Sequence, residues 1–235
     1  MKGKFYGVGV GPGDPELVTI KAKRIIERAD VLLVPITGKD KKSLALSIVE
    51  NLIPDKSKVQ ELNFPMSYDE GVLSENWDKS TAVLKSELAK GKEVAFLTLG
   101  DPSVYSTYIY LHRALEREGY KAEIIPGITS FCAASARLGI GLAENKETLA
   151  IIPAAYECSD VEAVLDKFDN IVLMKVARNI SKLKNILVKK CLHGKAVMVR
   201  RCGLDGEFIE CDVEKFDKYE SDYFTTVIVK KNGVL

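Results

Sequence analysis

The chain has 235 residues, of which 46% are hydrophobic and 29% are charged. This length is about one and a half times that of a typical domain, so a large core can form and a disulfide-stabilised miniprotein is excluded. The 34 basic and 33 acidic side chains leave a net charge of +1, which gives no overall positive field for nucleic acid or an anionic membrane. No apolar run is long enough to span a membrane and no cleavage-type segment follows the basic N-terminus, so we expect a cytoplasmic protein.

The cysteines and histidines argue against a metal centre. The five cysteines are odd in number and never occur as Cys-x-x-Cys, a pattern that indicates reduced, mostly buried, structural thiols. The two histidines, His112 and His193, lie far apart in the chain, so a zinc site or a histidine-based triad would have to be assembled from scattered residues. We therefore expect chemistry that uses neither a protein-bound metal nor histidine.

Apolar runs alternate with helical patterns along the chain, which is typical of α/β layers with largely parallel strands. The first set of strands is predicted at residues 5–10, 31–34, 59–62 and 94–99, with helices at 15–28, 44–52, 75–90 and 104–118. The second set has strands at 122–125, 149–152, 171–174, 196–199 and 223–229, the last antiparallel or at an edge, and helices at 130–138, 161–168 and 180–190. Gly119 is a C-capping glycine, and near it we place the boundary between an N-terminal domain (1–118) and a C-terminal domain (119–235).

The first motif, GVGVGPGDP at residues 7–15, joins a strand to a helix that is capped by Asp14. Its glycines do not have the spacing of a dinucleotide-binding fingerprint in any register, and the chain has no Gly-Lys-Ser/Thr phosphate loop. Asp14 at the helix N-cap would compete with a phosphate for the same backbone donors. The motif therefore favours a neutral or cationic ligand, or it is only a tight connection whose glycines need positive φ.

Three further motifs also follow strands. LTLGDPS at 97–103 forms a second turn at the same edge of a parallel sheet, where open α/β sheets bind ligands, and its Asp101 is either a plain N-cap or functional. IPGITS at 125–130 opens a helix of small residues, which permits close backbone approach or tight helix packing. The apolar strand 171–174 ends at Lys175, a surface or a functional residue, with Arg178 just beyond.

Together these segments resemble the tetrapyrrole (corrin and porphyrin) methyltransferases, which are class III S-adenosylmethionine enzymes. The resemblance spans the whole chain and rests on GVGVGPGDPELVTIKA, FLTLGDPSVYST, IPGITSF and VLMKVAR. Within the family it is closest to the enzymes that methylate carbon 20 of precorrin-2 or cobalt-factor II. The residues that favour this branch are Phe64-Pro65-Met66, Trp77, Tyr105-Ser106-Thr107, the segment 127–131 and Arg201-Cys202-Gly203. Leu99 departs from the family, where many relatives have a second glycine before Gly100.

The resemblance implies two α/β domains with largely parallel sheets, an active site in the cleft between them, and a homodimer. It implies S-adenosylmethionine as co-substrate and methyl transfer to carbon 20 of a reduced tetrapyrrole in cobalamin biosynthesis, without nucleic acid, membrane or protein-bound metal. The implied cofactor contacts are Pro12, Gly100, Asp101, Val104, Thr129, Ser130, Lys175, Val176, Gly203 and Thr226.

We expect Asp101, Lys175 and Tyr223 to be the catalytic residues, which orient the substrate or handle a proton. Arg137 and Arg178 join Lys175 as candidates to bind the substrate's carboxylates. Another methyltransferase of the same fold, acting on a different corrin carbon, uroporphyrinogen III, diphthine or ribosomal RNA, remains an alternative. A further alternative is a non-catalytic module that binds S-adenosylmethionine or a tetrapyrrole.

Overall fold

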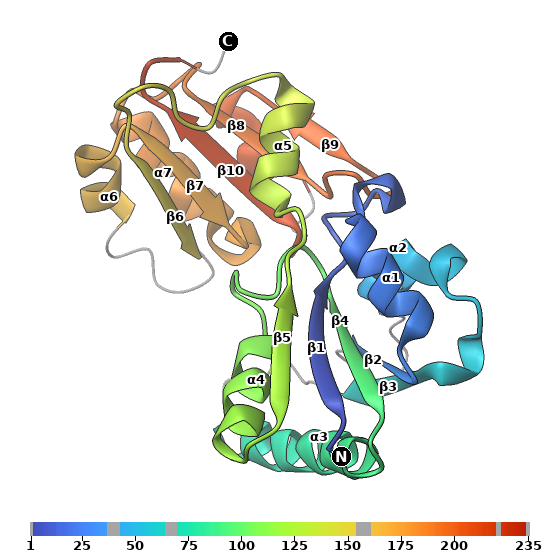
Figure 1. Ribbon diagram of the computed structural model, residues 1–235. Coiled ribbons are helices and arrows are strands. Elements are labelled where there is room, and N and C mark those ends of the chain that lie inside the picture. Colours follow the sequence, from blue (N-terminus) through green and yellow to red (C-terminus); the bar gives the residue numbers. More distant parts are fainter. Residues whose placement is uncertain (1, 37–42, 64–69, 154–160, 220–221, 234–235) are drawn as a thin grey trace. The chain divides into compact units, whose positions relative to one another are not determined.

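The computed structural model describes residues 2–36, 43–63, 70–153, 161–219 and 222–233. By its internal contacts the chain divides into two compact units, Met1–Thr129 and Ser130–Leu235, each with one five-stranded sheet and helices on its faces (Figure 1). Two α/β domains were expected from the sequence, and this architecture agrees with that expectation. Over the described ranges, no helix is both long and apolar enough to cross a membrane.

The first sheet has the strand order β3-β2-β4-β1-β5, and every neighbouring pair is parallel. The strands are β1 (Lys4–Gly9), β2 (Val31–Ile36), β3 (Val59–Asn63), β4 (Glu93–Thr98) and β5 (Lys121–Ile125). The sequence assigns β5 to the second domain, but β5 pairs with β1 at the edge of the first sheet. The contacts therefore divide the chain after Thr129, later than the boundary expected near Gly119.

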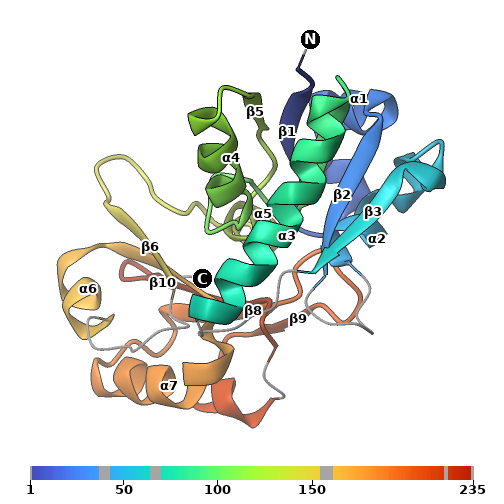
Figure 2. The same cartoon turned by 90° about the horizontal axis from the view of Figure 1, so that it is seen from below.

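Helices cover both faces of the first sheet. They are α1 (Ile20–Arg28), α2 (Leu44–Val49), α3 (Glu70–Ala89) and α4 (Tyr108–Arg117). α3 and α4, drawn in Figure 2, contribute leucines to one buried cluster. The cluster also contains alternate strand residues, among them Phe5 and Phe96. α1 contacts β1, and α2 contacts β2 and β4, but neither helix contributes to that cluster. Because successive strand residues face opposite sides, α1 and α2 pack on the other face.

The first helix begins later than predicted. Asp14 Oδ1 accepts a hydrogen bond from Glu16 N (2.8 Å), but it caps only one 3-10 turn, Pro15–Leu17, after which Val18 is extended. Thr19 caps the α-helix instead, since its Oγ1 accepts a hydrogen bond from Ala22 N (3.2 Å). Both residue types are good N-caps, and the extended Val18 is what separates them. The N-terminus of α1 is therefore separated from the glycine turn.

The helix predicted at 104–118 also starts later, at Tyr108. Tyr105 has a left-handed backbone (φ +47) that an α-helix does not accommodate. Ser106 Oγ accepts from Tyr108 N (3.2 Å) and so supplies an acceptor for the first turn of α4. The C-terminus is confirmed, because Gly119 follows the helix with φ +75.

The second sheet has the strand order β6-β7-β10-β8-β9 and is mixed. β6 is parallel to β7, whereas β10 is antiparallel to β7 and β8, and β9 is antiparallel to β8. Largely parallel pairing therefore holds only for the first unit. For β10 the sequence left two alternatives open, antiparallel or at an edge. The strand is antiparallel but not at an edge, because it pairs with β7 on one side and β8 on the other. The strands are β6 (Leu149–Pro153), β7 (Asn170–Met174), β8 (Ala196–Arg200), β9 (Phe208–Glu210) and β10 (Thr225–Lys230).

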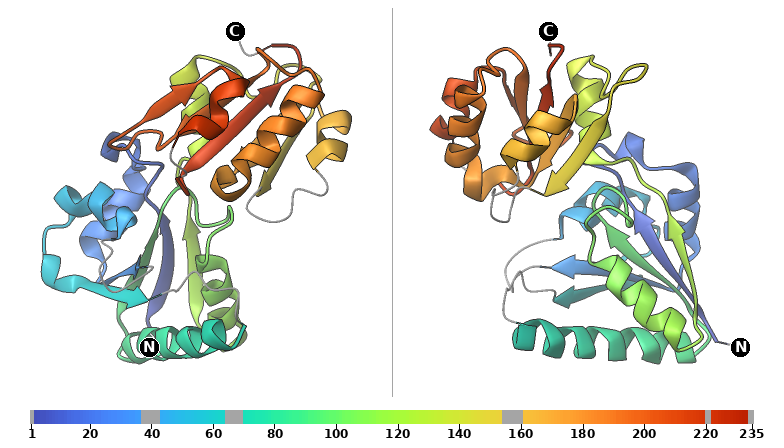
Figure 3. Two further views of the ribbon diagram at one scale, coloured as in Figure 1. Left: turned by 180° about the vertical axis from the view of Figure 1, so that it is seen from behind. Right: turned by 90° about the vertical axis from the view of Figure 1, so that its left-hand side faces the viewer.

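One face of the second sheet is covered by α6 (Val161–Lys167), α7 (Ile180–Lys189) and the 3-10 segment Val213–Lys218 (Figure 3). They form a buried cluster with alternate residues of β7, β8 and β10. α5 (Ser130–Leu138) contacts β10 and contributes nothing to that cluster, so it lies on the other face. The bounds of α5 agree with the prediction.

The cysteines are less buried than the sequence predicts. Cys132, Cys191, Cys202 and Cys211 are free thiols, whereas Cys158, like Phe64-Pro65-Met66, lies outside the described residues. The expectation of mostly buried thiols is wrong for this set, since all but Cys202 are exposed. Composition indicates that cysteines are reduced but does not say which face of an element they occupy. Burial raises the pKa of Cys202 to about 11.

Candidate active site

Three connecting segments converge at the carboxyl edge of the first sheet, where they follow the adjacent strands β4, β1 and β5. Two of them are joined by reciprocal hydrogen bonds: Gly100 N donates to Gly11 O (2.7 Å), and Gly11 N donates to Gly100 O (3.3 Å). Both glycines have positive φ, +80 at Gly11 and +69 at Gly100, which accounts for glycine at these positions. The predicted meeting of the two turns at one edge is confirmed.

Glycine also lets these segments approach one another closely. A Cβ atom at Gly127 would lie 2.1 Å from Gly100 O, and one at Gly9 would lie 2.6 Å from the same oxygen. Neither position has positive φ, so the requirement there is steric. A Cβ at Gly7 would instead meet the Tyr108 ring at 2.2 Å. We call the segments 10–14, 99–104 and 126–129 the glycine platform.

Asp101 ties two parts of the glycine platform together. Its Oδ2 accepts from Gly127 N (2.9 Å), and its Oδ1 accepts from the backbone N (2.7 Å) and the hydroxyl (2.5 Å) of Ser103. Val104 N donates to the Asp101 carbonyl (3.2 Å). The residue is only 9% exposed. Because both carboxylate oxygens are engaged, Asp101 fixes the geometry of the platform.

Thr129 brings an unsatisfied polar atom to the end of the platform. Its Oγ1 is buried and has no hydrogen-bond partner within the described ranges. Leaving a buried hydroxyl unpaired costs about 1–3 kcal/mol, so such an atom calls for an explanation such as a ligand. Of the neighbouring predicted contacts, Ser130 opens α5 and is half-buried, and Pro12 is buried beside Gly11.

A second group of predicted residues lies at the edge of the second sheet where β7 and β8 end and β10 begins. Lys175 follows β7 with a left-handed backbone (φ +59), and Val176 beside it is fully buried. Thr226 is 6% exposed and pairs with Met174 and Val199 on the flanking strands. Arg201, which follows β8, has the same left-handed backbone (φ +53), and strained residues of this kind are often found at functional sites.

Lys175 and Tyr223, two of the predicted catalytic residues, lie together at this edge. The Lys175 Nζ lies 5.1 Å from the centroid of the Tyr223 ring, which is a cation–π distance. Tyr223 is 41% exposed, and its ring meets that of Phe224 edge-on at 5.4 Å. Arg178 is exposed just beyond Lys175. The third predicted catalytic residue, Asp101, belongs to the first unit.

Gly203 makes a contact that sequence reasoning missed. Its N donates to Glu207 Oε2 (2.8 Å), while Glu207 Oε1 accepts from Arg137 Nε (2.6 Å). The hydrogen bond from Gly203, together with Arg137, holds the pKa of Glu207 below its usual value. Arg137, expected to bind a substrate carboxylate, is thus paired within its own unit. Arg137 and Glu207 lie far apart in the sequence, so no local pattern indicates that they pair.

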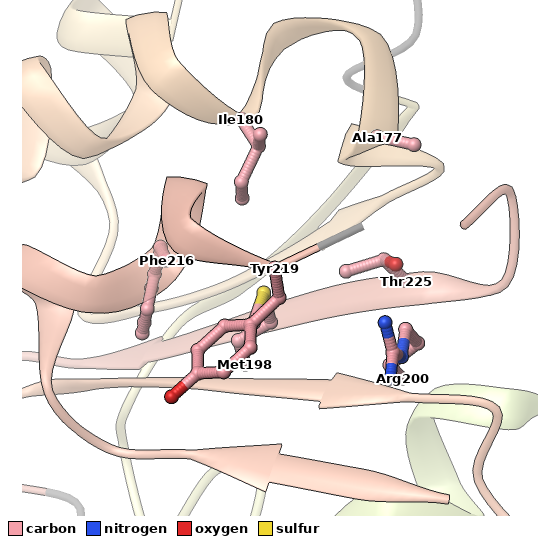
Figure 4. A pocket seen from close by; sticks show the side chains of 7 residues that line it. All are labelled: Ala177, Ile180, Met198, Arg200, Phe216, Tyr219 and Thr225. Carbon is pink, nitrogen blue, oxygen red and sulfur yellow. The ribbon is translucent and has the colours of Figure 1, made fainter. Parts of the chain in front are cut away.

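Figure 4 shows a small pocket on the face of the second sheet that α7 covers. It has about 230 Å³ of empty space, part of which is open solvent, and is lined by Ala177, Ile180, Met198, Arg200, Phe216, Tyr219 and Thr225. Thr225 faces this pocket, so its neighbour Thr226 faces the opposite side of the sheet. The pocket is therefore separate from the predicted contacts, and none of them lines it.

The model of the tetrapyrrole (corrin/porphyrin) methylases matches residues 4–217 of the chain. The chain belongs to this family. The matched range contains the glycine platform, β7 and Lys175. The family was predicted from motifs in these same segments, and that prediction is confirmed.

Two relatives are similar to the chain over nearly its full length. The cobalt-precorrin-2 C(20)-methyltransferase of Salmonella typhimurium LT2 is 36% identical over 234 residues, 98% of each protein. The precorrin-2 C(20)-methyltransferase of a Sinorhizobium species is 30% identical over 97% of this chain and 95% of the relative. Among solved structures, the uroporphyrin-III C-methyltransferase of Thermus thermophilus complexed with S-adenosyl homocysteine has a TM-score of 0.70 at 20% identity, with 97% of this chain and 98% of that chain covered. This likeness shows that the fold is shared.

Proposed function

We propose that the chain transfers the methyl group of S-adenosylmethionine to carbon 20 of a reduced tetrapyrrole in cobalamin biosynthesis. The observation that carries the proposal is the 36% identity to a cobalt-precorrin-2 C(20)-methyltransferase over 98% of both proteins. The substrate is precorrin-2 or its cobalt-containing counterpart, since relatives with either substrate in their names are similar over nearly the whole chain.

The glycine platform suits a positively charged methyl donor. Backbone carbonyls and the nearby Asp101 carboxylate favour a sulfonium, and the platform lacks the glycine spacing that cradles a pyrophosphate. The buried Thr129 hydroxyl, unpaired within the described ranges, offers a hydrogen bond to such a ligand. The residues proposed to hold the donor are Pro12, Gly100, Asp101, Val104 and Thr129 of the first unit, and Ser130, Lys175, Val176, Gly203 and Thr226 of the second unit.

S-adenosylmethionine supplies an electrophilic methyl group when bound. A meso carbon of a reduced tetrapyrrole is already electron-rich, so the chain mainly orients the reactants, an effect worth about 7–11 kcal/mol for well-oriented groups. Asp101 holds the platform, because both of its carboxylate oxygens accept hydrogen bonds from the chain. Lys175 and Tyr223 orient the substrate, Lys175 by pairing its ammonium with a substrate carboxylate. Only as a neutral amine would Lys175 also accept the proton that leaves the methylated carbon, a role worth about 100-fold to 10,000-fold.

The test uses S-adenosylmethionine labelled in its methyl group, with metal-free precorrin-2 or cobalt-factor II as acceptor. We expect a product with one added methyl group, located at carbon 20 by NMR. A methyl group at another carbon would contradict the proposed position, and binding of both compounds without product would make the chain a binding module. Lys175→Ala and Tyr223→Phe test the residues at the edge of the second sheet, because near-normal turnover in both would contradict their role in orienting the substrate or handling a proton.

We also propose that the protein works as a homodimer in the cytoplasm, without nucleic-acid or membrane partners. The support is the resemblance to the family and the net charge of +1, which gives no general attraction to polyanions. Analytical ultracentrifugation should give twice the 25.9 kDa mass of the chain. A sedimenting monomer at micromolar concentration would contradict the dimer.

A further inference from the structure

Tyr105 has an unusual conformation in the segment between β4 and α4. It is one of five described non-glycine residues with positive φ (+47), and the residue is 46% exposed. A bulky aromatic residue is strained in this region and stays there only when its surroundings impose the conformation.

The residues on both sides of Tyr105 are anchored. Before it, Val104 N donates to the carbonyl of Asp101 (3.2 Å), a residue of the glycine platform. After it, Ser106 Oγ lies 2.9 Å from the hydroxyl of Thr98, a buried residue at the end of β4. Ser106 Oγ also accepts a hydrogen bond from Tyr108 N (3.2 Å). Tyr108 is itself fully buried. The backbone of Tyr105 is therefore fixed from both ends.

The rest of the chain covers Tyr105 only in part. Nearly half of the residue stays in solvent, and its backbone strain opposes folding. Glycine would adopt the same φ without strain. In the chain, Tyr105 directly follows Val104, which we propose to contact the methyl donor. Tyr105 therefore belongs to an anchored segment that is continuous in the chain with the proposed donor site.

We propose that Tyr105 binds the tetrapyrrole by stacking its ring on one face of the macrocycle. This inference rests on the proposed function and extends it to a residue outside the proposed donor contacts. A tetrapyrrole has a broad conjugated face with its carboxylates at the rim, and an aromatic ring packs favourably on such a face. Because the backbone of Tyr105 is already fixed, little conformational entropy is lost when the substrate binds.

The experiment measures binding separately from turnover. Cobalt-factor II is titrated into the full-length protein and followed by its visible absorbance, and S-adenosylhomocysteine is titrated by calorimetry. We expect Tyr105→Ala to raise the Kd for cobalt-factor II about tenfold, with the Kd for S-adenosylhomocysteine unchanged within about twofold. Tyr105→Phe keeps the ring and should bind cobalt-factor II like the wild type.

Two further variants separate the ring from folding effects. Tyr105→Gly relieves the strain, so it should melt at the same temperature as the wild type or higher while binding cobalt-factor II as weakly as Tyr105→Ala. Tyr110→Ala is the matched control, because Tyr110 is 61% exposed on α4, and it should leave both Kd values unchanged.

Wild-type affinity for cobalt-factor II in Tyr105→Ala would overturn the assignment, and so would an equal weakening by Tyr110→Ala. A larger loss of S-adenosylhomocysteine affinity than of cobalt-factor II affinity would place the ring at the donor and also overturn it. If the wild-type protein neither binds nor methylates the tetrapyrrole, the proposed function fails and this inference fails with it. If the wild type methylates the tetrapyrrole but Tyr105→Ala binds it normally, only this inference fails.

Discussion

Replacing Asp101 by alanine removes three hydrogen bonds from the glycine platform at once. The bond from Gly127 N (2.9 Å) matters most, because this amide lies where the backbone segments are in closest contact. Hydrogen bonds to charged groups contribute about 1.5–3 kcal/mol each. Ser103 is exposed and exchanges its lost bonds for water. We therefore expect Asp101→Ala to lower the free energy of unfolding by about 3 kcal/mol.

Urea denaturation measures this loss, and two variants calibrate it. Asp101→Asn keeps the volume but replaces one acceptor oxygen with an NH2 donor that faces another donor. We expect it to cost about 2 kcal/mol. Ser103→Ala removes only the hydroxyl bond to the carboxylate (2.5 Å) and leaves the bond to Gly127 intact, so its cost should stay within about 0.5 kcal/mol.

The same variants test whether the platform forms the donor site. Calorimetric titration with S-adenosylhomocysteine should show an affinity at least about tenfold lower for Asp101→Ala, a loss of about 1.4 kcal/mol. Ser103→Ala should bind like the wild type. The reasoning is refuted if Asp101→Ala and Ser103→Ala unfold at the same urea concentration, or if Asp101→Ala binds this ligand normally.

Three further predictions concern packing, pH and thiol reactivity. Gly127→Ala places a Cβ 2.1 Å from Gly100 O and should destabilise the fold by about 3 kcal/mol or more in urea, whereas Gly194→Ala, with φ +69 and nothing within 4 Å, should cost only about 1–2 kcal/mol. Hydrogen bonds from two lysines lower the pKa of Glu123 from 4.5 to about 2. Its contribution to stability is therefore present above pH 4.5 and lost as the pH falls through 2, so Glu123→Gln should destabilise the protein at pH 7 but not at pH 2, and an equal effect at both would contradict this. With its pKa raised to about 11, Cys202 should react with iodoacetamide at pH 8 on the order of 100-fold more slowly than the exposed cysteines, and equal rates in peptide mass spectra would show that it is not buried.

Most helices and strands follow from local patterns in the sequence. Runs of Val, Ile, Leu and Phe mark the strands of both sheets, and α5 begins at Ser130 and ends at Leu138 as predicted. The meeting of the Gly11 and Gly100 turns was predictable because adjacent parallel strands end at one edge. The family was predictable because its motifs are contiguous segments. Such features depend on a few neighbouring residues, which a sequence displays directly.

Other local signals were ambiguous because two choices fit equally well. Asp14 and Thr19 are both favourable N-caps, and the extended conformation of Val18 makes Thr19 the cap of the α-helix. The helical pattern of α4 reaches back past Tyr105, but the fixed segment around this residue puts it in a left-handed conformation. In both cases surrounding contacts override a residue's intrinsic preference.

By itself, the sequence determined that the chain forms two α/β units of a known family, with glycine turns after β1 and β4. Only the tertiary structure decided that β5 joins the first sheet, that Arg137 pairs with Glu207, and that Asp101 holds Gly127. These are pairings between residues distant in the chain. Their energy depends on distances that are set only when the whole unit has folded, so no local pattern encodes these pairings.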